Sequence, residues 1–302
     1  MLMLVDAPGL WYRAFYGVPS SMRGPDGTQI NAVRGFCDGL STLIRNQRPT
    51  GLVCAVDANW RPDWRVELLP SYKAHRVATD GSEEEPDALG PQIEIILELL
   101  RCLGIATVGS TGFEADDVLA TLAGTNDGPV EVVTGDRDLF QLVDDDHPVR
   151  VIYIGRGIAK AETYDEAAVR QRFGVRADQY ADFAVLRGDA SDGLPGVKGV
   201  GDKTAAKLIT EFGDLATLLA AAADPTSSLT PRVRNSLAEA ADYLAVAPKV
   251  VRTVTDVPVP EYDTALPTGF ADEPGLTELT TKYGLANPVT RFGQAVSENP
   301  AL

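Results

Sequence analysis

The stretch that decides the fold is Val130-Glu131-Val132-Val133-Thr134-Gly135-Asp136-Arg137-Asp138, a short apolar run followed at once by two acids. Four similar runs occur elsewhere in the chain, at residues 2–5, 52–56, 105–108 and 149–154. Their length and their Val and Ile content are typical of strands buried on both faces of a parallel sheet. Apolar residues at helical spacing lie between them, at 30–46, 91–103 and 115–123. The pattern predicts an α/β domain with a mostly parallel sheet flanked by helices.

The 302 residues suffice for one large domain or two modest ones. From about residue 176 the pattern becomes entirely helical, and Val257-Pro258-Val259-Pro260 reads as an extended connector. We therefore predict an α/β domain over 1–175 with a long insertion at 59–90, a helical domain over 176–256 and a C-terminal extension over 257–302.

Several protein classes are disfavoured by the composition. No apolar run approaches the roughly 20 residues of a spanning helix, and the N-terminus lacks the basic region of a secretory signal, so we expect a cytoplasmic protein without a membrane partner. The three cysteines are widely spaced and are interpreted as core thiols. The net charge of −16 argues against a simple polyanion binder, unless many of the acids surround bound cations.

Acidic residues follow the strand ends, which is where parallel sheets bind ligands. They are Asp6, Asp57, Glu114, Asp116, Asp117, Asp136 and Asp138. Acids at a helix N-terminus are ordinary capping residues, which is the alternative reading for the group at 114–117. Seven acids at one edge would repel one another and raise their pKa values, which a divalent cation prevents. Oxygen-only ligation favours Mg²⁺ or Mn²⁺, and two such ions are suited to phosphodiester hydrolysis.

A glycine-rich segment joins two helices at residues 188–207. Gly196, Gly199 and Gly201 are expected to allow positive φ angles and close approach to a ligand. Exposed N–H groups beside Lys198, Lys203 and Lys207 suit a DNA phosphate, whereas the alternative is a plain turn between helices. Asp189 and Asp192 lie in the same segment and are expected to face the acidic edge.

Cations and aromatic residues alternate at residues 60–76. They are Trp60, Arg61, Trp64, Arg65, Tyr72, Lys73, His75 and Arg76. This composition is typical of a track for single-stranded nucleic acid. By itself it fits a solvated helix face equally well.

Three blocks resemble the bacterial 5′ nuclease domain of DNA polymerase I and its flap endonuclease relatives. They are Phe113-Glu114-Ala115-Asp116-Asp117-Val118-Leu119-Ala120, Thr134-Gly135-Asp136-Arg137-Asp138-Leu139-Phe140-Gln141-Leu142, and residues 188–207. The resemblance extends to about residue 250. It implies a PIN-like core, a helical arch and a C-terminal helix-hairpin-helix unit.

The resemblance also implies roles for individual residues. One metal cluster corresponds to Asp6, Asp57, Glu114, Asp116 and Asp117, and a second to Asp136, Asp138, Asp189 and Asp192, for two or three Mg²⁺ or Mn²⁺ ions in all. Arg13, Tyr72, Lys73 and Arg76 are expected to act at the scissile phosphate. DNA contacts are expected from Arg61, Arg65, Lys198, Gly199, Gly201, Lys203, Thr204 and Lys207. The carbonyls of Val197 and Val200 are expected to hold K⁺.

The function implied is a metal-dependent 5′-3′ exonuclease and flap endonuclease that acts on 5′ flaps, nicks, 5′ ends and RNA-primed DNA. Because the sequence has Ala7-Pro8-Gly9 where the family usually has small polar residues, the contacts with the DNA end are expected to differ there. With no polymerase sequence after residue 302, we expect a stand-alone, nucleoid-associated nuclease that cooperates with a DNA polymerase in trans. The alternatives are a catalytically inactive factor that binds DNA structures, and a PIN-type ribonuclease.

Overall fold

A computed structural model describes residues 1–302 except 80, 82 and 85, and its centre is a six-stranded sheet in the order β3-β2-β1-β4-β5-β6. The bounds are β1 Leu2–Asp6, β2 Gly51–Ala55, β3 Ala106–Val108, β4 Val130–Thr134, β5 Val149–Tyr153 and β6 Glu162–Tyr164. Neighbouring strands are parallel except β5 and β6. The carboxyl ends of five strands therefore share one edge, and the predicted α/β fold class is confirmed.

Both faces of the sheet are buried, and successive residues of a strand enter different cores. In β1, Leu4 packs into one apolar cluster, whereas Met3 and Val5 pack into the other. Burying both faces explains why the strands read as continuous apolar runs in the sequence.

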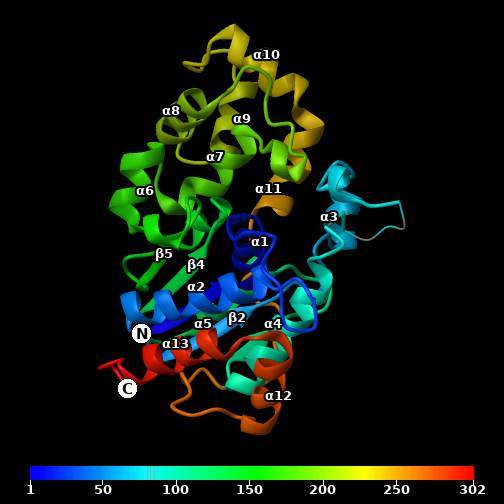
Figure 1. The fold of residues 1–302 in the computed structure, drawn as a ribbon. Coiled ribbons are helices and arrows are strands. Elements are labelled where there is room, and N and C mark those ends of the chain that lie inside the picture. The colour runs from blue at the N-terminus through cyan, green and yellow to red at the C-terminus, as the bar shows by residue number, and fades with distance from the viewer. Residues whose placement is uncertain (80, 82, 85) are drawn as a thin grey trace.

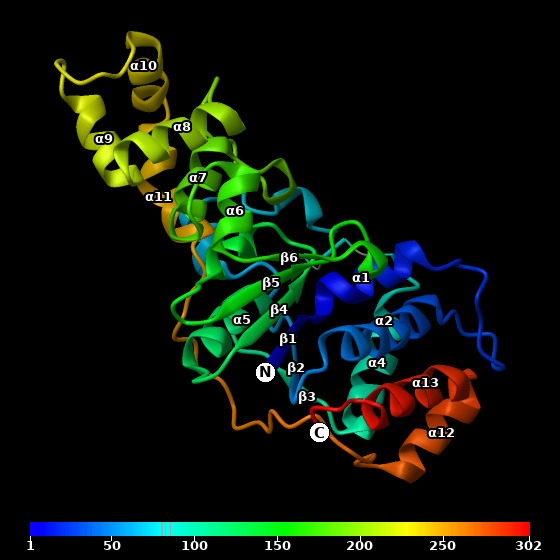
Figure 2. The same ribbon diagram turned by 90° about the vertical axis from the view of Figure 1, so that its left-hand side faces the viewer.

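Helices cover the two faces unequally. Helices α1 (Ala7–Gly17), α2 (Asn31–Gln47) and α4 (Gly90–Leu103) lie on one face, and α5 (Ala115–Thr125) lies on the other, as Figure 2 shows. Helix α6 (Glu166–Phe173) packs near β6. Asp6 caps α1 by accepting the Gly9 N–H at 2.8 Å. The first strand therefore passes directly into a helix at the acidic edge.

The helical domain lies beyond one end of the sheet in both views (Figures 1 and 2). It consists of α7 (Tyr180–Arg187), α8 (Asp202–Phe212), α9 (Leu215–Ala223), α10 (Pro231–Glu239) and α11 (Ala241–Val251). The hairpin loop 188–201 joins α7 to α8. Short 3-10 turns precede α7 at Ala177–Gln179 and lie within the loop at Ala190–Asp192.

The C-terminal residues return to the α/β domain. Leu52 N–H donates to the Thr264 carbonyl, and Leu266 N–H donates to the Thr50 carbonyl, so residues 264–266, just after the extended connector, run beside the start of β2. The last two helices, α12 (Glu273–Tyr283) and α13 (Ala286–Ser297), pack on α4 and α2 respectively. This tail is therefore part of the core that covers one face of the sheet.

The insertion at 59–90 contains less helix than its predicted role as an arch suggests. Within its described part, α3 (Asp63–Leu68) and a 3-10 turn at Ala74–Arg76 precede the start of α4. Residues 80, 82 and 85, which belong to the predicted acidic stretch 80–87, lie outside the described residues. No helix in the described part of the chain is long and apolar enough to cross a membrane.

Candidate active site and nucleic-acid interface

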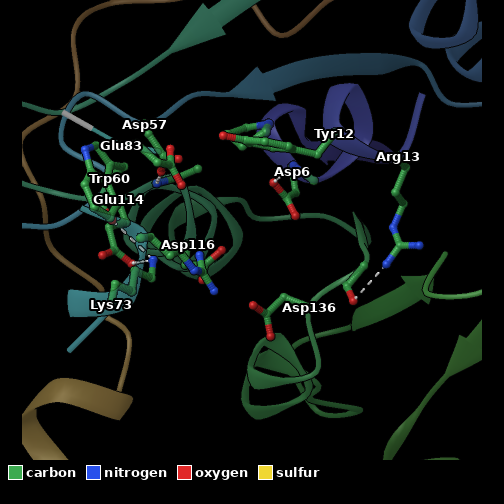
Figure 3. Close-up of a pocket in the computed structure, with 15 residues that line it drawn as sticks. Asp6, Tyr12, Arg13, Asp57, Trp60, Lys73, Glu83, Glu114, Asp116 and Asp136 are labelled. Carbon is green, nitrogen blue, oxygen red and sulfur yellow. Dashed lines mark hydrogen bonds and ion pairs between the residues drawn. The ribbon is translucent and has the colours of Figure 1, made fainter. Parts of the chain in front are cut away.

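A cleft of about 260 Å³ opens at the carboxyl ends of the central strands. Five of the predicted metal ligands line it, together with three of the predicted phosphate-binding cations: Asp6, Asp57, Glu114, Asp116, Asp136, Arg13, Lys73 and Arg76. Figure 3 shows Asp6 and Asp136 approaching the open space from different chain segments, with Arg13 to one side. The fold therefore brings residues from five separate segments to one place.

Asp6 and Asp136 are connected through the hydroxyl of Thr134. Thr134 Oγ1 donates to Asp6 Oδ2 at 2.8 Å and accepts the Asp136 N–H at 2.9 Å. Burial raises the pKa of Asp6 to about 6, although hydrogen bonds from Gly9 and Thr134 lower it. One buried hydroxyl therefore sets the positions of the acid that ends β1 and an acid that follows β4.

Glu114 is buried between two side chains of the insertion. Lys73 Nζ lies 3.0 Å from Glu114 Oε2, and the Tyr72 hydroxyl donates to the same carboxylate at 2.9 Å. Burial raises the pKa of Glu114 to about 7, against the lowering effect of the charges of Lys73 and Arg65. The solvated-face reading of the insertion is wrong for Tyr72 and Lys73, because their side chains face the site.

Asp57 and Asp116 complete this side of the cleft. The exposed Asp57 accepts the Ala115 N–H at 2.7 Å and so connects the end of β2 with the start of α5. Burial and the charges of Asp136 and Asp6 raise the pKa of Asp116 well above its ordinary value. Crowded carboxylates of this kind are stabilised in their charged form by a bound cation.

The second predicted cluster, apart from Asp136, lies beside the cleft. Asp138, Asp189 and Asp192 do not line it, but Arg76 reaches from the cleft to Asp192 Oδ1 at 2.9 Å. The Lys73 N–H donates to the Asp192 carbonyl at 2.9 Å, and a Cβ on Gly193 would stand 2.0 Å from the Ser71 carbonyl oxygen. The hairpin loop is therefore packed directly against the insertion, and Gly193 permits that approach.

The donor set fits divalent cations by its chemistry. Asp138 Oδ1 is buried without a hydrogen-bond partner, and burial with the charge of Asp136 raises the pKa of Asp138 well above its usual range. A buried unpaired carboxylate oxygen is costly unless a cation or proton neutralises it. The acids surround a space instead of converging on one point: within the described residues, no three acid, His or Cys side chains form a ready-made cage.

Two predicted site residues are placed elsewhere. Asp117 is fully buried, and both its oxygens accept hydrogen bonds from Arg65, at 2.7 and 2.8 Å. Arg65 is 2% exposed. The prediction that Arg65 contacts DNA is therefore wrong, because its charged group faces the core, and Asp117 is turned away from the cleft by the same ion pair.

Two other arginines of the predicted site donate hydrogen bonds to backbone carbonyls. Arg61 donates to the carbonyls of Tyr72 and Pro70, at 2.6 and 3.0 Å, and its contact with DNA stays a prediction. Arg13 donates to the Gly155 carbonyl at 2.8 Å and lines the cleft. Arg13 also donates to the Gly135 carbonyl at 3.5 Å, so its guanidinium is held between the loops that follow β4 and β5, at one side of the cleft (Figure 3).

The hairpin loop and the first two turns of α8 together present an exposed basic surface. Lys198, Gly199, Gly201, Lys203 and Lys207 are exposed, and Thr204 is half-buried. Gly196 and Gly199 have φ angles of 65° and 78°, as expected. Gly201 does not: its φ is −99°, and it forms the N-cap of α8. The Val197 carbonyl accepts the Val200 N–H at 2.9 Å, and K⁺ binding there stays a prediction.

Sequence reasoning missed three residues of the site. Thr134 occupies the last position of an apolar strand, where a polar residue before Gly135-Asp136 was the available signal. Tyr12 and Glu83 also line the cleft, and Tyr12 donates a hydrogen bond to Glu83. The link between them joins α1 to the insertion, which no local pattern indicates.

Thr134→Val is expected to lower the free energy of unfolding by about 1–3 kcal/mol, because it leaves Asp6 Oδ2 and the Asp136 N–H unpaired at nearly constant volume. Urea unfolding of the variant measures this loss. Thr107→Val, at an exposed position of the edge strand β3, is the matched control. A variant as stable as its control would contradict the role assigned to the hydroxyl.

Comparison with known proteins identifies the family. Residues 1–174 match the family described as "5′-3′ exonuclease, N-terminal resolvase-like domain", and residues 175–272 match "5′-3′ exonuclease, C-terminal SAM fold". The chain belongs to the 5′-3′ exonuclease family. This membership confirms the predicted resemblance and the nuclease class of the enzyme.

Relatives of similar length occur among the 5′-3′ exonucleases. A 5′-3′ exonuclease of Streptomyces coelicolor is 54% identical, over 96% of this chain and 98% of that protein. A 5′-3′ exonuclease of Mycobacterium tuberculosis is 47% identical, over 99% of this chain and 98% of that protein. The structure of bacteriophage T5 flap endonuclease, a complex with DNA and metal ions, has a TM-score of 0.64 at 17% identity and covers 99% of this chain and 98% of that one. The latter likeness is one of fold.

Proposed function

We propose that this 5′-3′ exonuclease cleaves phosphodiester bonds at 5′ flaps, nicks and 5′ ends of DNA, with two or three Mg²⁺ or Mn²⁺ ions at the acidic edge. The observation that carries this proposal is one cleft in which five of the predicted metal ligands meet three cations. Acids suit the binding of divalent ions, and the cations suit a substrate phosphate at the same place.

The metal ligands in this proposal are eight acids in two groups. Asp6, Asp57, Glu114 and Asp116 form the first, and Asp136, Asp138, Asp189 and Asp192 the second. When bound, such ions lower the pKa of a water nucleophile and stabilise the leaving oxygen. Asp117 is left out of the ligand set because of its pairing with Arg65.

The protein's own cations orient the substrate. Arg13 is held by the Gly155 carbonyl at one side of the cleft, and Lys73 and Arg76 reach it from the insertion. Together these groups can hold a phosphate from two sides, which fixes the scissile bond relative to the acids. Lys73 pairs with Glu114 and Arg76 pairs with Asp192, so a bound phosphate would compete with these acids for the two cations.

The hairpin is proposed to bind the duplex through its backbone. Exposed N–H groups and lysines at a turn between helices recognise phosphates without reading the base sequence. This placement would put the duplex on the helical domain and its 5′ strand toward the cleft. We also propose K⁺ at the carbonyls of Val197 and Val200.

Lys203→Ala is expected to weaken duplex binding to a similar extent for all sequences and to reduce the salt slope by about one unit, because one phosphate contact releases about one counterion. Fluorescence anisotropy at several salt concentrations measures the slope. Lys160→Ala, at an exposed position near β6, is the control. An unchanged slope for Lys203→Ala would favour the plain-turn reading of the hairpin.

The proposal is tested with labelled substrates. A 5′-labelled flap, a nicked duplex and an RNA-primed duplex are incubated with the protein in Mg²⁺, in Mn²⁺ or in EDTA. Cleavage with either metal and none in EDTA is the expected result. Binding without cleavage would support an inactive DNA-binding factor, and cleavage of RNA alone would support a PIN-type ribonuclease.

The cellular role follows from the substrates. A nuclease for 5′ flaps and RNA-primed DNA would act on the bacterial nucleoid in the cytoplasm, during replication and repair. Flaps arise when a polymerase displaces the strand ahead of it, so we propose that this enzyme cooperates with a DNA polymerase in trans.

A further inference from the structure

The buried ion pair between Arg65 and Asp117 lies beneath the acidic edge, outside the cleft. The Arg65 guanidinium forms two hydrogen bonds to the Asp117 carboxylate, 2.7 and 2.8 Å long. Both side chains are inaccessible to solvent, with 3% and 0% of their surface exposed. Arg65 belongs to α3 of the insertion, and Asp117 to the first turn of α5.

The pair also binds the end of the helical domain. Arg65 Nε donates to the Val250 carbonyl at 3.1 Å, and the Val254 N–H donates to Asp117 Oδ1 at 2.8 Å. Val250 belongs to the last turn of α11, and Val254 lies just beyond that helix. Three segments that are distant in the sequence therefore meet at one buried carboxylate.

The same carboxylate fixes the turn that carries two site acids. Asp117 Oδ2 accepts the Glu114 N–H at 3.3 Å, as part of a capping box at the start of α5. Arg65 Nη1 lies 3.5 Å from Glu114 Oε2. Glu114 and Asp116 both line the cleft, so their position depends on this turn.

The hydrogen bonds of Asp117 use its whole capacity as an acceptor. An ionised carboxylate offers about four lone-pair sites, two on each oxygen. Oδ1 accepts from Arg65 and Val254, and Oδ2 accepts from Arg65 and Glu114. A metal ion would have to break one of these bonds and approach a buried guanidinium, which repels it.

We propose that Arg65 and Asp117 act as one positioning unit, which connects the helical DNA-binding domain to the turn bearing Glu114 and Asp116. Neither residue touches the metal or the DNA. The unit makes the geometry of the acidic edge depend on the docking of α11. This inference rests on the proposed metal-dependent nuclease function.

The two possible roles of Asp117 predict different results for Mn²⁺ binding, measured by calorimetry on the full chain without DNA. As a positioning unit, Asp117→Asn, Arg65→Gln and the double variant should each weaken Mn²⁺ binding by a similar factor of about ten. If Asp117 is instead a metal ligand, only its own replacement should weaken Mn²⁺ binding. Asp117→Asn would then lower the Mn²⁺ affinity, whereas Arg65→Gln, which frees the carboxylate, would leave the affinity unchanged or raise it. That second pattern would overturn the inference.

A DNA role for Arg65 is tested in parallel. Arg65→Gln should leave the flap affinity and its salt slope unchanged in EDTA, whereas a lowered slope would assign Arg65 to a phosphate contact. Asp38→Asn is the matched control. It removes the charge of another carboxylate of the α/β domain that accepts two hydrogen bonds from one arginine, Arg291 of α13, and should leave Mn²⁺ binding unchanged.

Hydrogen exchange of the wild-type protein provides a test that needs no folded variant. If Asp117 is a positioning residue, Mn²⁺ should preserve or increase the protection of the Val254 amide. If Mn²⁺ takes the lone pairs of Asp117, that amide should exchange at least tenfold faster. A wild-type protein that neither binds Mn²⁺ nor cleaves a flap would overturn the proposed function itself. If the wild type does both, but Asp117→Asn weakens Mn²⁺ binding and Arg65→Gln does not, only the positioning unit is overturned.

Discussion

Replacement of Asp136 by asparagine is expected to abolish cleavage of a 5′-flapped duplex while preserving flap binding. Asp136 lies at the open side of the cleft, one residue beyond the Gly135 turn after β4. Asparagine has nearly the same size but lacks the charge that binds a divalent ion. The hairpin lysines, which are proposed to hold the duplex, lie in another domain and are unchanged.

The expected loss is at least about a thousandfold in single-turnover rate, which corresponds to about 4 kcal/mol of transition-state stabilisation. Rapid-quench cleavage at saturating enzyme measures the rate, and anisotropy in EDTA measures binding. Asp127→Asn is the matched control, because Asp127 is an exposed acid before β4, near the opposite end of that strand. A turnover near that of the wild type would remove Asp136 from the site.

Lys73→Ala and Arg76→Ala are each expected to reduce the single-turnover rate tenfold or more, with a smaller effect on KM. The physical reason is that these cations hold the scissile phosphate mainly as it reaches the metals, so their contribution belongs to the transition state. A tenfold loss corresponds to about 1.4 kcal/mol. Rates within about twofold of the wild-type rate would show that neither residue contacts the scissile phosphate in the transition state.

The structure adds a second readout for Lys73. Its backbone has a positive φ of 47°, a conformation that alanine also disfavours, so Lys73→Ala changes the charge at similar backbone strain. Because Lys73 is a cation that pairs with Glu114, a proposed metal ligand, its removal should not weaken Mn²⁺ binding. A slow variant with weakened Mn²⁺ binding would indicate damage to the acidic edge instead of a lost phosphate contact. Lys160→Ala again serves as the control.

The sequence predicted the parallel strands to within about a residue at each end, because short continuous runs rich in Val and Ile are typical of strands buried on both faces. Strand β6 was missed since its three residues, Glu162–Tyr164, are too short and too polar to show a period. Helix α1 was not predicted, because Pro8 and Gly9 are poor helix formers in general. In the first turn of a helix capped by Asp6, however, proline is well tolerated.

The sequence predicted which residue types form the site more successfully than it predicted the direction in which each side chain points. Three acids at 114–117 looked equivalent in the sequence, yet successive residues of a helix differ by about 100° in direction, so Asp116 faces the cleft and Asp117 the core. Arg65 looked like a surface cation because arginine is rarely buried unless it is paired. Its partners, Asp117 and Val250, are remote in sequence and could not be inferred from local spacing.

The return of the tail to the start of β2 determines where the two chain ends emerge. The Met1 ammonium donates to Thr50 Oγ1, and Asn299 Nδ2 donates to the Pro49 carbonyl, so one corner of the molecule holds both ends. Figure 1 shows the N and C labels close together there. This corner lies a full five-residue strand from Asp6, about 17 Å at 3.3 Å per residue. A surface tether or a fluorescent label attached at either end would therefore leave the cleft open to DNA, which makes single-molecule observation of cleavage practicable from both ends of the chain.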